Sequence, residues 1–476
     1  MIFSSTLFLL YFLPVFLIVY HLVPTVLKNW VLLFASLFFY AWGAPKFIFV
    51  VVGSVIVDYY IVNMMYKSPE EKKRKGLLFL SIVINLGLLL YFKYANFFVE
   101  NLNQVLLSFG AKDINWTAVV LPIGISFYTF QTLTYSIDVY RGVHKPLKNP
   151  IQYLVYIMLF PQMIAGPIVR FNEIADQITN RKHLETIDNK LLGMFRFGIG
   201  LAKKVLIANV MGVEADRVFG LAEGDLTTPI AWVGIVAYTF QIYYDFSGYS
   251  DMAIGLGRVI GFKFPENFDN PYISQSITEF WRRWHITLGA FMRDYLYIPL
   301  GGNRVKTKSR LFFNLWLVFI LSGLWHGAAW NFVLWGAFHG AFLILDRLFL
   351  LKVFKTIGKY SSVLITFIIT MVGWVLFRSE SIDQAIFFTQ KLFAFDLKPI
   401  ETALDNEFIT ILIVAIFFAF ITISKWGLKI EQKVFFSKEY TLKGYIFMTL
   451  VLLVLLYVSI ITIVASGFNP FIYFRF

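Results

Sequence analysis

Apolar residues run along the chain in blocks of about 20 positions, which is close to the length that an α-helix needs to cross a bilayer. Strands of a membrane β-barrel would instead alternate apolar and polar residues, and these blocks show no such alternation. The pattern predicts about twelve spanning helices. The expected spans are residues 5–23, 28–42, 46–66, 76–96, 117–137, 192–212, 229–250, 311–329, 331–350, 360–377, 408–424 and 444–465.

Composition supports the same class. Of the 476 residues, 58% are hydrophobic and 15% are charged, whereas soluble domains carry about 25% charged residues. An apolar chain of this length exceeds what one soluble core can bury. We therefore expect an all-α polytopic membrane protein that forms a single membrane-embedded domain over residues 1–476.

Charge is concentrated in the segments between the blocks. The formal net charge is +13. Counting the spans alternately places every basic segment on one face and both acidic segments on the other, as expected when basic loops are cytoplasmic. This argues for both termini outside and against nucleic-acid binding. The basic segments are 67–75, 141–148, 302–310, 352–359 and 425–443, and the acidic ones are 214–225 and 396–407.

Three features do not fit simple spans. Lys203 and Lys204 fall inside one span, where a charged pair is costly unless it lines a wet cavity or reaches the interface. Residues 150–170 and 248–310 are apolar but interrupted by Pro and Gly. Irregular backbone at membrane depth persists only inside protein or beside water. We therefore expect re-entrant or interfacial elements there.

The sequence pattern of segment 276–300 is typical of a helix that lies in the membrane interface. Ser276 and Glu279 form a capping-box pattern that marks a helix start, and an apolar, aromatic stripe follows at helical spacing up to Pro299. The arginines off this stripe match either lipid headgroups or a phosphorylated ligand. His285 lies at the edge of the stripe, where a structural role is the ordinary reading.

His326 ends a long apolar run, so it is expected deep in the membrane. An ionisable group at that depth suggests function, and imidazole suits proton transfer near neutral pH. The plain alternative is a neutral histidine bonded to a carbonyl. Small neighbours such as Gly323 and Gly327 permit either close helix packing or an open channel. His339 is a weaker candidate. The chain has no cysteine, so acyl or group transfer cannot use a thiol nucleophile.

Four long motifs occur in order and resemble the membrane-bound O-acyltransferase superfamily, and within it the bacterial group that acts in alginate O-acetylation. They are YYDFSGYSDMAIGLG (243–257), ENFDNPYISQSITEFWRRWHITL (266–288), RDYLYIPLGGNR (293–304) and GLWHGAAWNF (323–332). Shorter stretches, including the closing GFNPFIYF (467–474), extend the resemblance over essentially the whole chain.

The resemblance implies a helical bowl of about 11–12 spans with re-entrant helices and a central tunnel, its catalytic core about residues 117–350. Residues about 1–116 and 351–476 would be peripheral. It assigns His326 to the family's buried histidine, most tied to transfer, and His285 to the second polar position. We expect His326 as general base and His285 as a group that orients the donor or stabilises the oxyanion; a covalent acyl-histidine is the alternative. Further expected site residues are Trp281, Arg282, Arg283 and Arg293 for the donor, and Asp245 and Asn331 in the tunnel.

The expected reaction is O-acetylation of an exported polysaccharide, most readily alginate, from cytoplasmic acetyl-CoA. We expect no metal and no permanently bound cofactor. The chain has no large extracytoplasmic domain in its predicted loops, so a periplasmic acetyltransferase is the expected partner, and the bacterial inner membrane the expected location. Alternatives are peptidoglycan or cellulose acetylation, D-alanyl transfer, a transporter or flippase, and a non-catalytic scaffold; the lack of repeated halves disfavours a transporter.

Overall fold

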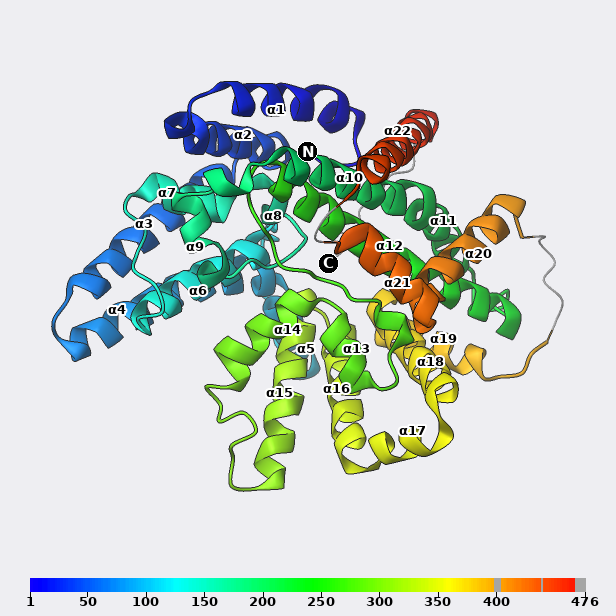
Figure 1. Ribbon diagram of the computed structural model, residues 1–476. Coiled ribbons are helices and arrows are strands. Elements are labelled where there is room, and N and C mark those ends of the chain that lie inside the picture. The colour runs from blue at the N-terminus through cyan, green and yellow to red at the C-terminus, as the bar shows by residue number, and fades with distance from the viewer. Residues whose placement is uncertain (398–403, 438–439, 467–476) are drawn as a thin grey trace. The chain divides into compact units, whose positions relative to one another are not determined.

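The computed structural model describes residues 1–397, 404–437 and 440–466, and these are helical apart from loops and one isolated β-bridge (Figure 1). Contacts group the chain into two compact units. Unit 1 comprises 1–193 and 253–265, and unit 2 comprises 194–252 and 266–476. Two of the three boundaries fall within helices α10 (Ile187–Ala202) and α12 (Thr228–Val259), and the third follows Pro265 in a loop. The division into units does not test the prediction that residues 1–476 form a single membrane-embedded domain, and this stays a prediction.

Unit 1 is built from the first ten helices, in which α3, α4 and α6 pack side by side (Figure 1). A π-helical turn, η1 (Leu7–Phe12), leads into α1, and another, η3 (Leu90–Tyr94), joins α4 to α5. The helices are α1 (Leu13–Leu22), α2 (Lys28–Gly43), α3 (Ile48–Lys67), α4 (Glu71–Leu89), α5 (Ala95–Ser108), α6 (Ile125–Tyr140), α7 (Pro150–Met158), α8 (Phe160–Met163), α9 (Phe171–Thr179) and the start of α10 (Ile187–Ala202).

Unit 2 contains the remaining helices. Their tightest pair is α15 and α16, which run side by side (Figure 1). The helices are α11 (Asn209–Phe219), α12 (Thr228–Val259), α13 (Ile277–Arg283), α14 (Ile286–Met292), α15 (Lys308–His326), α16 (Trp330–Leu345), α17 (Leu351–Ile357), α18 (Lys359–Arg378), α19 (Ile382–Leu392), α20 (Asn406–Phe420), α21 (Lys425–Phe435) and α22 (Leu442–Ala465). The π-turns η5 (Lys203–Ala208), η7 (Arg293–Tyr297) and η8 (Asp346–Leu350) connect or extend them.

The prediction of an all-α polytopic membrane protein is confirmed. Six helices among the described residues are long and apolar enough to cross a membrane by length and composition. They are Thr25–Gly43, Ile48–Lys67, Glu71–Ser108, Lys359–Arg378, Asn406–Ile423 and Leu442–Ala465. Helices also cover the other expected spans, although these helices are shorter or less apolar. The closing GFNPFIYF motif and part of the acidic loop 396–407 lie outside the described residues.

One expected span starts too early. Residues 117–124 are not helical, and α6 begins only at Ile125. Pro122 and Gly124 explain the difference, because Gly124 has φ +77°, a left-handed conformation that favours glycine. A Cβ at Gly124 would also lie 2.7 Å from the carbonyl oxygen of Met163. The backbone therefore turns at this point before the helix starts.

The charged pair inside the 192–212 span has a structural explanation. Lys203 Nζ lies 2.6 Å from Asp251 Oδ2, and Lys204 Nζ lies 2.7 Å from Asp245 Oδ1. Arg196 contacts Asp251 at 2.9 Å and also pairs with Glu266. Buried charges are tolerated when they are paired and hydrogen-bonded. The lysines thus fasten the helix of residues 187–219 to α12 within unit 2.

Glycines bring α15 and α16 together. A Cβ on Gly323 would lie 2.2 Å from the Phe332 carbonyl oxygen, and one on Gly336 would lie 2.3 Å from that of Phe319. A Cβ on Gly327 would likewise clash with the Phe332 ring. Of the two predicted uses of these small residues, the structure therefore shows close helix packing.

Candidate functional site

The structure confirms the predicted start of the helix over 276–298. It shows two α-helices in this range, however, where the sequence predicted one. Ser276 accepts a hydrogen bond from the Glu279 main-chain N–H at 3.1 Å, as a helix cap should. The helix then breaks after Arg283. His285 has φ +46°, and α14 begins at the next residue. The sequence pattern could not reveal the break, because the apolar spacing continues across it.

The break is stabilised by the strand-like segment before it. Phe268 and Trp284 form an antiparallel bridge. The main-chain N–H of Ile286 donates to the Asn267 carbonyl oxygen at 2.9 Å, and that of Asp269 donates to the Arg283 carbonyl oxygen at 2.9 Å. These bonds replace the helical bonds that residues near 285 would otherwise make. The imidazole of His285 is consequently held at a helix start and not along a helix face.

The side chain of Asn267 contacts the His285 ring. His285 Nδ1 lies 3.0 Å from Asn267 Oδ1, and the Thr287 hydroxyl donates to the same oxygen at 2.8 Å. Asn267 Nδ2 donates to Ser250 Oγ on α12 at 3.0 Å. Asn267 and His285 are each 1% exposed. His285 Nε2 has no hydrogen-bond partner among the described residues.

His326 is the last residue of α15 and is 7% exposed. Its ring centroid lies 6.4 Å from that of His285, so the structure brings together the two predicted catalytic histidines. Aromatic rings pack around His326 at centroid distances of 4.9–5.2 Å, and they belong to Trp325, Trp335 and Phe377. His339 is fully buried on the far side of Trp335, with ring centroids 5.1 Å apart.

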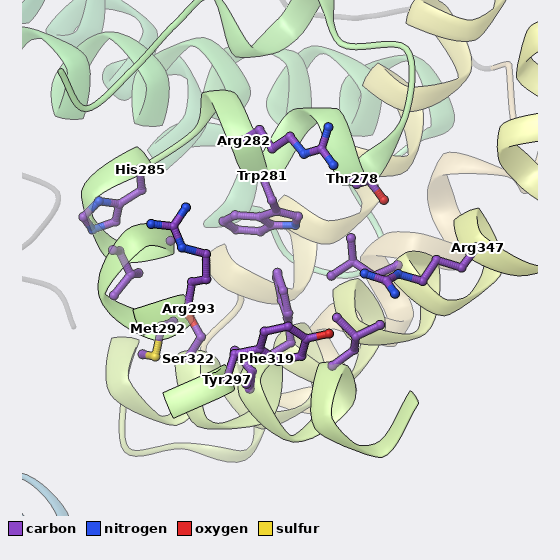
Figure 2. A pocket seen from close by; sticks show the side chains of 15 residues that line it. Thr278, Trp281, Arg282, His285, Met292, Arg293, Tyr297, Phe319, Ser322 and Arg347 are labelled. Atoms are coloured by element: carbon purple, nitrogen blue, oxygen red, sulfur yellow. The ribbon is translucent and has the colours of Figure 1, made fainter. Parts of the chain in front are cut away.

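A pocket opens beside His285 and runs between α13–α14 and the α15–α16 pair, and His326 is not among the residues that line it. Figure 2 shows His285 at one end and Arg347 at the other, with Trp281 between them. Ser322, one helical turn before His326, also lines the pocket. The indole Nε1 of Trp281 has no hydrogen-bond partner among the described residues. Two lining residues, His285 and Trp281, thus carry ring nitrogens without a partner in the described part of the chain, and other polar side chains, among them Thr278 and Ser322, line the same pocket.

Three arginines line the pocket. Arg282 is exposed, Arg293 forms a two-bond ion pair with Asp294, and Arg347 donates to Asn303 Oδ1 at 3.2 Å (Figure 2). The fork of an arginine matches the oxygens of a phosphate group. Arg283 does not line the pocket, because it pairs with Glu279 at 3.0 Å and Asp269 at 3.1 Å.

Asp245 and Asn331, the remaining predicted site residues, bond to other helices of the fold. Asp245 forms the ion pair with Lys204 described above. Asn331 Nδ2 donates to the Ser379 carbonyl oxygen at 2.7 Å and so ties α16 to the end of α18. No group of three or more His, Asp or Glu side chains in the described part of the chain could hold a metal ion.

Sequence reasoning missed Asn267 and Arg347. Asn267 lies within the quoted 266–288 motif, yet nothing in its spacing relates it to a histidine 18 positions later. Arg347 lies inside the expected span 331–350, ahead of the basic segment 352–359, and the pattern assigns it no role there. Only the folding of α16 against α13 and α15 brings it to the pocket.

Comparison with known proteins gives a consistent result. Residues 76–378 match the sequence profile of the membrane-bound O-acyltransferase family. The chain is 41% identical to a "Probable alginate O-acetylase AlgI" of Pseudomonas putida over 100% of both chains. It is 44% identical to a protein of the same name from Azotobacter vinelandii, over 90% of this chain and 85% of that one. A "Peptidoglycan O-acetyltransferase" of Helicobacter pylori is 38% identical over 81% and 78% of the two chains.

Proposed function

The chain belongs to the membrane-bound O-acyltransferase family, and from this membership we propose that it transfers acetyl groups from acetyl-CoA toward an exported polysaccharide of the alginate type. That it is a multi-pass membrane O-acyltransferase follows from the family and the apolar helices. The donor, the acceptor and the location in a bacterial inner membrane are the proposed parts. Relatives named for alginate O-acetylation support the choice of acceptor.

One observation carries the proposal: two buried histidines lie 6.4 Å apart, and one of them, His285, lines a pocket that arginines also line. Imidazole is suited to general-base catalysis, which contributes about 10²–10⁴-fold to a rate. The arginines supply positive charge for the phosphates of coenzyme A. The basic segments 302–310 and 352–359 flank the pocket in sequence, which supports a cytoplasmic opening.

In the proposed reaction, the acceptor hydroxyl oxygen attacks the thioester carbonyl carbon of the donor. His326 takes the hydroxyl proton as the attack proceeds. The tetrahedral intermediate then expels the coenzyme A thiolate, which receives the proton from the imidazolium, so the ester and free thiol are the products. The Trp281 indole N–H, a donor on the pocket wall, is the proposed hydrogen-bond partner of the thioester oxygen.

The proposed acceptor route involves a second protein. The predicted outer loop 378–407 has about 30 residues, of which helix α19 (Ile382–Leu392) takes 11, and a loop of this length is too short for a sugar-binding domain. We propose that a periplasmic acetyltransferase receives the acetyl group and places it on the polymer. Substantial ester formation by this chain alone with acetyl-CoA and polymer would contradict the relay while leaving the acyltransfer intact.

The proposal is tested by replacing the histidines in the full chain, in cells that make the polymer. His326→Ala and His285→Ala should each abolish polymer acetylation while the amount of protein in the membrane stays normal. Ser274→Ala is a matched control, since Ser274 is buried nearby and donates only to the Pro271 carbonyl oxygen at 2.7 Å. Full acetylation in both histidine variants would overturn the proposal and favour a scaffold.

A flippase is the second candidate, favoured by the charged residues in the helix of residues 187–219. Their pairing with Asp245 and Asp251 weakens it, because paired charges leave little to bind a transported ion. Acetyl-CoA turnover by the purified chain with its partner and polymer separates the two. A transporter would release no free coenzyme A.

A further inference from the structure

We propose that Asn267 is a positioning residue that holds His285 in the Nδ1–H tautomer, so that the ring presents a bare proton acceptor, Nε2, at the pocket. The inference rests on the proposed function, because it defines what His285 can do in acyl transfer. It goes further in two ways. It excludes stabilisation of the oxyanion as a role of His285, and it adds Asn267 to the residues on which the reaction depends.

The hydrogen bonds of Asn267 settle which of its side-chain atoms faces the ring. The Thr287 main-chain N–H and hydroxyl both reach the Asn267 Oδ1, at 3.4 and 2.8 Å. A main-chain N–H can only donate, so the atom that receives it is an acceptor. On its other side, Asn267 Nδ2 donates to Ser250 Oγ. The Thr287 main-chain N–H thus determines the amide orientation, and the Ser250 hydroxyl, which can donate or accept, is compatible with it.

The tautomer of His285 follows from that orientation. Its Nδ1 lies 3.0 Å from an oxygen that already accepts from Thr287, so Nδ1 must carry the hydrogen. In the neutral ring Nε2 is then unprotonated. That atom has no hydrogen-bond partner among the described residues, although the ring is 1% exposed and lines the pocket. A buried acceptor without a partner is costly and marks a place for a ligand hydrogen.

This geometry narrows the role of His285. A neutral ring with a bare Nε2 accepts a hydrogen bond or a proton, and it cannot donate one to the oxyanion of the tetrahedral intermediate. We therefore assign His285 to the reacting hydroxyl, which it orients or whose proton it shares with His326. The oxyanion must find its donor elsewhere on the pocket wall, and Trp281 Nε1 is available there.

The backbone around Asn267 is held as firmly as its side chain. Glu266 pairs with Arg196, which also contacts Asp251 on α12. The Asn267 carbonyl oxygen accepts from Ile286 at 2.9 Å. The left-handed conformation of His285 is costly for a residue with a Cβ and persists only where its surroundings enforce it. Residues 266–268 enforce the conformation of His285, because Glu266 and Asn267 are themselves tied to α12.

Other charged or titratable groups surround the pocket end where His285 lies. The His326 ring on α15 lies 6.4 Å from the His285 ring, and Arg282 and Arg293, on either side of the break, line the same pocket as His285. None of these groups is replaced in the variants below. A change in pH response can therefore be traced to the contact between residues 267 and 285.

The direct test is a measurement of the tautomer in the full chain, labelled with ¹⁵N at its six histidines and embedded in lipid. The spectrum of His285→Gln identifies the His285 signals. In the unaltered chain Nδ1 should resonate as a protonated nitrogen and Nε2 as an unprotonated one. In Asn267→Ala the Nε2–H form should appear. Observing Nε2–H in the unaltered chain would overturn the inference.

The kinetic test uses [¹⁴C]acetyl-CoA supplied to inverted membrane vesicles from polymer-making cells. Asn267→Ala should lower the maximal rate by about 10²-fold, with little change in KM, because general-base catalysis contributes at least that factor. Asn267→Asp should restore much of the rate, since a carboxylate also accepts from Nδ1–H. It should also shift the acid limb of the pH–rate profile to higher pH, because the carboxylate stabilises the imidazolium.

The outcomes separate the two proposals. If His285→Ala is inactive but Asn267→Asp leaves the pH profile unmoved, the positioning role is wrong and the acyltransfer proposal stands. If His285→Ala keeps full activity, the role of His285 in the reaction is wrong, whatever the tautomer. A purely structural Asn267 would lower the amount of protein in both Asn267 variants equally, without rescue by Asp and without a pH shift.

Discussion

Each compact unit contains a buried polar cluster, and the two clusters differ in how completely they are satisfied. In unit 1 the Asp58 carboxylate accepts from Ser81 at 2.5 Å, Asn85 at 3.0 Å and Tyr153 at 2.6 Å. In unit 2 the His285 ring is held at Nδ1 only, its Nε2 has no partner among the described residues, and the residue lines a pocket. Both clusters consist of buried polar side chains: Asp58 is 0% exposed and His285 is 1% exposed.

The comparison shows what distinguishes a structural cluster from a reactive one. Every polar atom around Asp58 gains a partner when α3, α4, α6 and α7 pack, so the cluster stabilises that packing. Around His285 the protein bonds Nδ1 and leaves Nε2 without a partner in the part of the chain that the structure describes, and on the inference above this second atom accepts a hydrogen from a ligand. Burial alone therefore does not indicate function, whereas a buried acceptor without a partner at a cavity does.

The largest expected effect is on the reactive cluster. The variants His285→Ala and His326→Ala should each lower acetyl transfer by about 10²–10⁴-fold, the range of general-base catalysis. If the two rings act as one unit, the double variant should lose no more than the worse single variant. The measurement is the transfer rate at matched protein levels. Losses that multiply would show that the two histidines act independently.

The Asp58 cluster should respond in the opposite way. Asp58→Ala leaves the Tyr153 hydroxyl without its acceptor, and an orphaned buried group costs about 1–3 kcal/mol. Ser81 and Asn85 each lose one hydrogen bond but keep those to Ser136 Oγ and the Ser81 carbonyl oxygen, respectively. Thermal unfolding of the purified full chain should therefore begin at lower temperature, while activity per folded molecule stays near that of the unaltered chain. An unchanged unfolding temperature together with lost activity would contradict a purely structural role for the Asp58 cluster.

The arginines give a smaller effect, confined to donor binding. Arg282→Ala should raise the KM for acetyl-CoA by about tenfold, the loss of roughly one charge-assisted contact, with little change in maximal rate. Arg283→Ala is the matched control, because its side chain is held by Glu279 and Asp269 away from the pocket. Equal KM values for the two variants would contradict a phosphate site at the pocket.

The smallest effect is expected at Asn331, which the sequence placed in the tunnel. Its amide ties α16 to the Ser379 carbonyl oxygen. Asn331→Ala should lower the free energy of unfolding by about 1 kcal/mol, the net value of such a hydrogen bond. Acetyl transfer per folded molecule should not change. A large loss of transfer with normal stability would return Asn331 to the site.

The helical class could be predicted from sequence because long apolar blocks allow few other structures. The start of α13 was also predictable, since Ser276 and Glu279 are adjacent on one turn and need no distant partner. The break at His285 was not, because it depends on hydrogen bonds to Asn267. For the same reason Lys203 and Lys204 seemed out of place until the structure put Asp251 and Asp245 beside them.

The site shows the same division between local and distant information. His326 stood out as an ionisable residue at the end of an apolar run, and His285, Trp281 and Arg282 belong to one motif. That the motif meets α15 at the two histidines is a property of the fold. Arg347 and Asn267 join the site only through tertiary contacts, and no periodicity along the chain could have indicated them.

The central claim is most directly tested by supplying [¹⁴C]acetyl-CoA to the cytoplasmic face of sealed vesicles and counting label in polymer esters. The account predicts labelled polymer with the unaltered chain, and none above background with His326→Ala at the same protein level. Equal labelling by the two chains would contradict it.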